Sequence, residues 1–160
     1  MAVADMIGAA VGVILLVIVA YLLVGSVLST SQIVTSAQKS ATSLEEHQLK
    51  TDFTIGQAGI DATGINCTIT NTGNEPISDF SQMDVYVYDS DTGAYQLYRY
   101  ASAPGTPGTW AILSRGTDIV HPGELDPGET YRILVQTTGI SPAWFQITTA
   151  NAVSASSYLS

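Results

Sequence analysis

The chain has 160 residues, with 14 acidic against 5 basic side chains and a formal net charge of −9. Such an acidic balance argues against nucleic acid as a partner, because phosphate binding needs clustered lysine and arginine. The single cysteine, Cys67, excludes an intrachain disulfide and a cysteine-based zinc cluster. Setting aside the first fifty residues, as argued below, leaves room for one globular domain of about 110 residues.

The chain begins with an apolar run, MAVADMIGAAVGVILLVIVAYLLVGSVLSTSQ. Residues 6–28 carry no charge, and as a helix they would extend roughly 34 Å, enough to cross a hydrocarbon core of about 30 Å. A secretory signal would have a basic start and a shorter apolar stretch. The run therefore indicates a membrane anchor, or a stem that packs against copies of itself, rather than a cleaved signal.

The helix is expected to continue well beyond the apolar run. Neither glycine nor proline occurs from Ser26 to Thr54. Apolar residues at three- and four-residue steps form one stripe on this polar stretch: Ile33, Ala37, Ala41 and Leu44. The pattern predicts one helix from about Val3 to Leu49, apolar in its first half and amphipathic in its second.

Three residues near the start are candidates for helix packing. Gly8 and Gly12 form a small-xxx-small pattern, which lets helix backbones approach closely in a membrane, although glycine is common in such helices anyway. Asp5 fits a carboxylate in the headgroup region that complements the helix N-terminus. The alternative is that Asp5 neutralises a neighbouring chain's amino terminus in a helical bundle.

Charge near the membrane ends gives almost no information on orientation. The nearest basic residue, Lys39, lies eleven residues past Leu28, and the N-terminal side offers only Asp5. This weak signal would place the following domain inside the cell. We nevertheless expect the domain outside, because an acidic, turn-rich β domain behind one N-terminal anchor is the usual pattern of surface-appendage subunits.

Residues 51–160 show the alternation of β-strands, so we divide the chain into a helical part, 1–50, and a β domain, 51–160. In the stretch INCTIT, Ile65, Cys67 and Ile69 point inward and Asn66 points outward. Turn residues separate seven expected strands: 65–70, 83–88, 94–100, 110–113, 118–120, 131–136 and 144–153. Short strands at about ten-residue spacing predict an all-β immunoglobulin-like sandwich.

Two surface features of this domain are candidate sites. Asn66-Cys67-Thr68 is an N-glycosylation sequon, and the alternation points Asn66 outward, as modification requires. Five tyrosines cluster on one predicted hairpin: Tyr86, Tyr88, Tyr95, Tyr98 and Tyr100. They fit either cross-strand pairs that stabilise the sheet or an exposed partner surface, for which Tyr86, Tyr88, Tyr98 and Tyr100 are the candidates.

No arrangement typical of catalysis or metal binding stands out. His47 follows Glu45 and Glu46 on the stem, and His121 precedes a proline in a turn, without a nucleophile at a suitable spacing. The stretch DSDTG places Asp89 and Asp91 in a partial calcium-loop pattern that lacks the rest of an EF-hand, which favours a plain hairpin turn. We therefore expect no enzyme, cofactor, metal ion or small-molecule substrate.

The architecture and the stretches ITNTGNEPISDFSQMDVYVYD and HPGELDPGETYRILVQT resemble the archaellum family of archaeal flagella, most of all its FlaF type, with FlaG and the archaellins as relatives. The resemblance implies an anchor in the cytoplasmic membrane and a sandwich in the pseudo-periplasm that grips the surface layer and holds the motor as a stator. Archaellins and archaeal pilins carry a short basic leader ending in Lys-Gly or Arg-Gly. The sequence shows none, which favours the stator over the filament subunit.

Two functions thus follow as expectations. The first is a membrane-anchored module that binds the surface-layer protein or other archaellum components. The second is an extracellular filament subunit, related to type IV pilins, that forms a homo-oligomer through its N-terminal helix. The environment of the helix separates the two.

Overall fold

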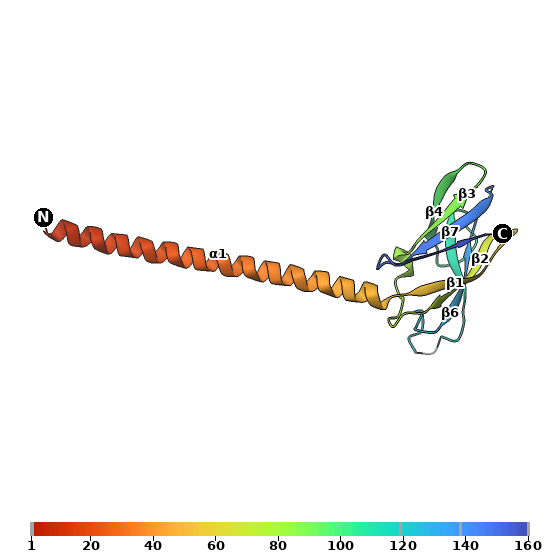
Figure 1. Ribbon diagram of the computed structural model, residues 1–160, viewed down its shortest axis with the longest axis horizontal. Coiled ribbons are helices and arrows are strands. Elements are labelled where there is room, and N and C mark those ends of the chain that lie inside the picture. Colours follow the sequence, from red (N-terminus) through yellow and green to blue (C-terminus); the bar gives the residue numbers. More distant parts are fainter. Residues whose placement is uncertain (1, 119, 138, 160) are drawn as a thin grey trace. The chain divides into compact units, whose positions relative to one another are not determined.

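The computed structural model describes residues 2–118, 120–137 and 139–159. Helix α1 runs without interruption from Ala2 to Lys50 (Figure 1). Its bounds agree within one residue with the helix expected from Val3 to Leu49. The absence of glycine and proline from Ser26 to Thr54 explains the continuity of its second half, since either residue weakens or breaks a helix interior.

The remainder of the chain forms an eight-stranded β-sandwich, as expected (Figure 1). One layer has the strand order β1-β2-β6-β5 and the other β4-β3-β7-β8, and all pairs within each layer are antiparallel. A two-residue parallel pairing of Arg99 with Thr109 and of Tyr100 with Trp110 joins β4 to β5. The strands are β1 Phe53–Asp61, β2 Gly64–Asn71, β3 Asp84–Asp89, β4 Ala94–Tyr100, β5 Thr109–Arg115, β6 Thr130–Val135, β7 Pro142–Thr148 and β8 Ser154–Tyr158.

The core lies between the two layers and consists of the inward half of each alternating strand. Trp110, Tyr131 and Phe145 are its largest fully buried side chains. The expected inward residues of β2 and β3 are all buried: Ile65, Cys67, Ile69, Met83, Val85 and Val87. Alternation therefore assigned the faces of these strands correctly, because a period of two permits only one face toward the core.

Three parts of the domain differ from expectation. Strand β1 was not expected, because Gly56 and Gly59 interrupt its pattern at a bulge where Gln57 has a φ of 46°. The strand expected at 118–120 is wrong for Asp118 and Val120, which lie in a loop, whereas Ile119 is outside the described residues. Gly116 and Pro122, which disfavour strand structure, flank this segment. The Gly123 backbone N–H donates to Asp118 Oδ2, which holds the segment as a loop.

The segment expected as the last strand, 144–153, divides into two. Strand β7 ends at Thr148, a turn follows in which Ala152 has a φ of 61°, and β8 begins at Ser154. The serine-rich β8 has little strand propensity of its own, and it is held by antiparallel pairing with β7.

By internal contacts the chain divides into two compact units, residues 1–43 and 44–160. The boundary lies seven residues before the one expected at residue 50. The last two turns of α1 or so, residues 44–50, therefore belong with the sandwich, and the contacts described next explain why.

Candidate membrane helix and interaction surfaces

The apolar half of α1 is long enough and apolar enough to cross a membrane. Every described side chain from Val3 to Lys50 is exposed. A Cβ atom added at Gly8 or Gly12 would meet nothing within 4 Å. The side chain of Asp5 lies outside the described residues. Within the described part of the chain, the apolar surface is thus uncovered, and lipid or other chains must cover it.

The turn between β2 and η1, a short 3-10 helix at Phe80–Gln82, holds the end of α1. The Asn74 backbone N–H donates to the Lys50 carbonyl oxygen at 2.8 Å, and the N–H groups of Thr72 and Gly73 both donate to the Asp52 carbonyl. These bonds satisfy carbonyl groups that a helix end otherwise leaves without partners. The last turn of α1 is therefore fastened to the sandwich through backbone contacts.

An ion pair adds to this junction. His47 Nδ1 lies 2.6 Å from Glu75 Oε1, while Oε2 of the same carboxylate is buried without a partner among the described residues. The sequence placed His47 beside Glu45 and Glu46 but gave no sign of Glu75, which is distant along the chain. The pair has a structural role, because it joins the helix to the turn. Among the described residues, no nucleophilic side chain is hydrogen-bonded to the His47 imidazole.

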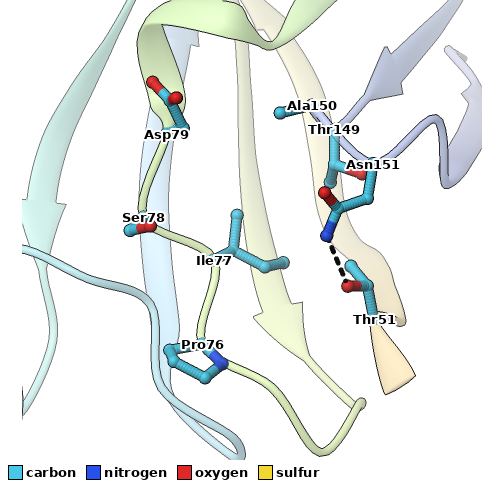
Figure 2. A pocket seen from close by; sticks show the side chains of 8 residues that line it. All are labelled: Thr51, Pro76, Ile77, Ser78, Asp79, Thr149, Ala150 and Asn151. Atoms are coloured by element: carbon cyan, nitrogen blue, oxygen red, sulfur yellow. Dashed lines mark hydrogen bonds between the residues drawn. The ribbon is translucent and has the colours of Figure 1, made fainter. Parts of the chain in front are cut away.

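A small hollow lies between the segment 76–79 and the turn 149–151 (Figure 2). Asn151 Nδ2 donates to Thr51 Oγ1 at 2.9 Å, and Thr51 Oγ1 donates to the His47 carbonyl. Asp79 is the one titratable side chain among the residues that line the hollow. These hydrogen bonds connect the β7–β8 turn to the end of the helix. The described residues around the hollow therefore stabilise the fold rather than form a catalytic site.

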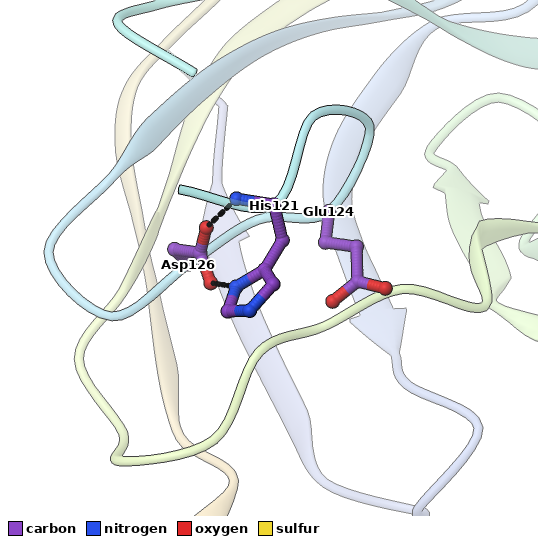
Figure 3. Close-up of side chains that lie close together, drawn as sticks. All are labelled: His121, Glu124 and Asp126. Atoms are coloured by element: carbon purple, nitrogen blue, oxygen red, sulfur yellow. Dashed lines mark hydrogen bonds and ion pairs between the residues drawn. The ribbon is translucent and has the colours of Figure 1, made fainter. Parts of the chain in front are cut away.

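A second cluster closes the loop that precedes β6 (Figure 3). His121 Nδ1 lies 2.8 Å from Asp126 Oδ1, and the His121 backbone N–H donates to Asp126 Oδ2 at 3.0 Å. The hydrogen bond and charge of the Asp126 carboxylate raise the pKa of His121, with Glu124 and Glu129 adding to the effect. Both oxygens of the buried Asp126 carboxylate are thus engaged in holding the loop closed.

Ligand atoms of His121, Glu124 and Asp126 lie within 4.8 Å of one another, close enough to hold a metal ion together. The Nδ1 atom of His121 and the Asp126 carboxylate already bond to each other. The arrangement is complete as a loop closure, and the expectation that His121 has no catalytic partner stays a prediction.

A buried tyrosine anchors the same loop to the sheet. The Tyr131 hydroxyl donates to the Glu124 carbonyl, a few residues upstream, and lies 3.1 Å from Asp118 Oδ2. Burial, together with the Asp118 carboxylate, raises the pKa of Tyr131. A tyrosine at a strand start that bonds back to upstream backbone is a recurring corner of immunoglobulin-like sandwiches. The hydrogen bond from Tyr131 to Glu124 thus holds in place the loop where a strand was expected at 118–120.

The aspartates of the DSDTG stretch form the hairpin turn that the sequence favoured. Asp89 is 1% exposed and accepts hydrogen bonds from the Thr92 hydroxyl at 2.6 Å and the Ser141 backbone N–H at 3.0 Å. These bonds hold the pKa of Asp89 below its ordinary value. The Asp91 carboxylate accepts from the Ser141 hydroxyl. Asp89 thus joins the β3–β4 turn to the start of β7.

The tyrosine cluster divides between the two faces of its sheet. Tyr98 is 2% exposed and lies in the core, and Tyr100 packs against buried Trp110 with ring centroids 5.0 Å apart. The prediction that Tyr98 belongs to a partner surface is therefore wrong, because alternation along β4 turns it into the core. Tyr100 is half-buried against the core, and its part in a partner surface stays a prediction. Tyr86 and Tyr88 lie on the outer face, half-buried, together with the exposed Tyr95.

Asn66 lies on the outer face of β2, as the alternation indicated. Its side-chain amide donates to the Asp61 carboxylate at the β1–β2 turn. Glycosylation of Asn66 stays a prediction, and the mass of the peptide that contains it would test the modification.

Comparison with known proteins matches residues 4–156 to the archaeal-type flagellin family. An uncharacterized protein of Archaeoglobus fulgidus is 25% identical over 121 residues, which are 74% of this chain and 71% of that protein.

Two solved structures from Sulfolobus acidocaldarius are also similar. The archaellum periplasmic stator protein FlaG is 20% identical, with a TM-score of 0.50 over 67% of this chain and 97% of that one. A chain of the archaellum periplasmic stator complex of FlaF and FlaG is 21% identical, with a TM-score of 0.48 over 66% and 85%. The match to FlaG shows that the chains share a fold.

Proposed function

Because this chain belongs to the archaeal-type flagellin family, we propose that it is a membrane-anchored archaellum component whose sandwich binds a partner in the cell envelope. The apolar half of α1 lies in the cytoplasmic membrane and the sandwich lies outside it, in the pseudo-periplasm. There the sandwich binds the surface-layer protein or another archaellum component and acts as a stator. The likeness in fold to FlaG, itself described as a periplasmic stator protein, supports this role.

One observation carries the proposal: a single uninterrupted helix joins an uncharged span to a sandwich that is fastened to the helix end. The span from Met6 to Leu28 has the length of a membrane crossing. The bonds from Asn74 and Gly73 to the backbone of residues 50–52 fix the sandwich to the last turn of the helix.

A filament subunit is the second candidate, and it is equally compatible with the archaeal-type flagellin family. Flagellins assemble into fibres, and the helix surface around Gly8 and Gly12 is free of contacts within the described chain. In that case copies of α1 surround one another, and the chain is an extracellular homo-oligomer. Asp5 would then face a neighbouring chain rather than lipid headgroups.

Replacing the two glycines with a larger residue distinguishes the anchor from the filament subunit. In a cell that produces the protein, we would replace Gly8 and Gly12 with leucine and follow membrane insertion, filament assembly and swimming. As a matched control, Ala10→Leu with Ile14→Leu changes the opposite face of the helix, because residues two apart point in nearly opposite directions.

An anchor tolerates both double variants, since lipid adapts to apolar bulk, and swimming persists. A filament subunit with leucine at positions 8 and 12 is made and inserted but no longer assembles, whereas the control still does. Fibres built from the unmodified protein would overturn the anchor in favour of the filament subunit.

A further inference from the structure

The outer face of the layer β4-β3-β7-β8 carries an aromatic row that the sequence does not reveal. The register pairs Tyr158 with Trp144, Trp144 with Tyr88, and Tyr88 with Tyr95. One aromatic side chain from each of the four strands thus lies in line across the sheet. Strands are about 4.8 Å apart, so the row extends roughly 14 Å.

These four side chains face solvent. Val87, Phe145 and Tyr98 are buried on the opposite side of the same strands, which fixes the row as the outer face. Tyr95 is 66% exposed and Tyr158 is 84% exposed, while Tyr88 and Trp144 are half-buried between them. Large aromatic side chains left this open indicate a binding surface, since their burial is favourable.

The neighbouring row decides the chemistry of the occupant. The same register places Ser156, Gln146, Tyr86 and Leu97 side by side along the next line of the sheet. The two rows together hold five aromatic side chains, an amide, a hydroxyl and one aliphatic side chain, and none is charged. Asp84 and Arg99 lie on the next line of the same face, so the uncharged surface is confined to these two rows. Within the two rows a charged occupant would find no ion-pair partner.

We infer that these two rows bind a neutral carbohydrate, as an oligosaccharide laid across the four strands. The C–H groups on a pyranose face are apolar and slightly positive, and they pack on the negative face of an aromatic ring. The sugar hydroxyls would take hydrogen bonds from Gln146, Ser156 and the tyrosine hydroxyls. Aromatic faces flanked by uncharged polar groups meet both requirements.

The ring orientations favour a short, twisted oligosaccharide over a flat surface. The rings of Tyr88 and Tyr95 lie 5.1 Å apart at 49°, and those of Tyr95 and Trp144 lie 5.9 Å apart at 89°. Successive rings therefore present steps rather than one plane. This inference does not rest on the proposed function, because both an anchored module and a filament subunit would present the same face.

Binding is tested with the full chain in phosphatidylcholine nanodiscs, which avoids detergents with sugar headgroups. The probes are maltotetraose, cellotetraose and mannotetraose, followed by saturation-transfer NMR and by tryptophan fluorescence. Trp110 is fully buried, so a fluorescence change on titration reports Trp144. We expect saturable binding of at least one tetrasaccharide with a Kd on the order of 1 mM or below.

The variants Tyr95→Ser and Tyr158→Ser remove exposed rings and should leave the fold intact. Each should weaken binding about tenfold, by comparison with the loss of one stacked base from an aromatic side chain. Leu113→Ser, an exposed apolar position on β5 in the other layer, is the matched control and should bind like the unmodified chain.

Failure of all three tetrasaccharides to bind at about 10 mM would overturn the inference. Binding that survives the double variant Tyr95→Ser/Tyr158→Ser would overturn it as well. Self-association that the same double variant abolishes, without any sugar binding, would replace it with a second copy of the chain as the occupant.

Discussion

At Cys67, burial rather than hydrogen bonding controls the reactivity of the thiol. The side chain is 1% exposed between Ile65 and Ile69, and burial raises its pKa to about 12. The nucleophilic thiolate is therefore scarce at neutral pH, and reagents cannot reach the sulfur. Cys67 acts as a small core hydrophobe.

We expect Cys67 to resist a maleimide or a disulfide reagent in the native protein at about pH 8 and to react fully in denaturant. A Cys67→Ala/Ser156→Cys variant, with its thiol on exposed β8, provides the reactive control. Rapid native labelling of the unmodified chain would mean that the faces of β2 are reversed, which would also turn Asn66 inward.

The His121–Asp126 pair makes the stability of the loop before β6 depend on pH. The pKa of His121 is raised in the folded protein, chiefly by the bond to Asp126. Its stabilising contribution is therefore complete below the unfolded-state pKa of about 6.5 and is lost as the pH rises through the folded-state value. We expect the unmodified chain to have a higher urea midpoint than the His121→Gln variant. This difference should be larger at about pH 5.5 than at about pH 8.5.

A double-mutant cycle isolates this pair from other titrating groups. In an Asp126→Asn background, adding His121→Gln should change the urea midpoint equally at both pH values. Parallel pH profiles of the unmodified chain and the single His121→Gln variant would show that the pair does not contribute.

At the level of elements, the junction of α1 with the β2–η1 turn depends on a glycine. A Cβ atom at Gly73 would lie 2.5 Å from both the Lys50 carbonyl oxygen and the Asp52 nitrogen. Backbone atoms cannot move aside as a flexible side chain can. The close approach explains why the turn TNTGN places glycine at this position.

We expect Gly73→Ala to lower the free energy of unfolding by about 1–3 kcal/mol, the usual cost of forcing extra atoms into a packed site. The matched control is Gly59→Ala on β1, where a Cβ atom meets nothing within 4 Å. Urea unfolding of both variants makes the comparison. Equal midpoints would mean that the turn does not hold the helix end.

For the whole molecule, the division into two units predicts that residues 44–160 fold without the rest of α1. This part contains all eight strands, the core and the junction contacts from His47 onward. We expect the fragment Leu44–Ser160 to be soluble, to show the circular dichroism of a β protein, and to unfold in one cooperative transition.

The thermal midpoint of this fragment should lie within a few degrees of the midpoint of the sandwich in the full chain, because all the core residues lie within the fragment. A fragment starting at Phe53 is the informative comparison, since it lacks the junction contacts and should be less stable. A largely helical or unfolded spectrum of Leu44–Ser160 would contradict the prediction.

Local patterns were sufficient for much of the fold. The continuity of the second half of α1 follows from the absence of glycine and proline after Gly25, and the faces of β2 and β3 follow from strict alternation. The resemblance to the archaellum family drawn from the same stretches is confirmed by the family match over residues 4–156. Strands β1 and β8 were missed because a bulge and a run of serines remove the local signal, and pairing partners hold them instead.

The amino-acid sequence alone determined the long helix and the sandwich class, because each follows from the spacing of neighbouring residues. The family was indicated by the resemblance of two stretches of the chain, and the family match shows it. The tertiary structure alone decided which side chains meet. His47 with Glu75, Gly73 against Lys50, and the row from Tyr158 to Tyr95 join residues far apart along the chain. Strand order and register create these neighbours, and register is fixed by burial of one whole face of each layer rather than by any local motif.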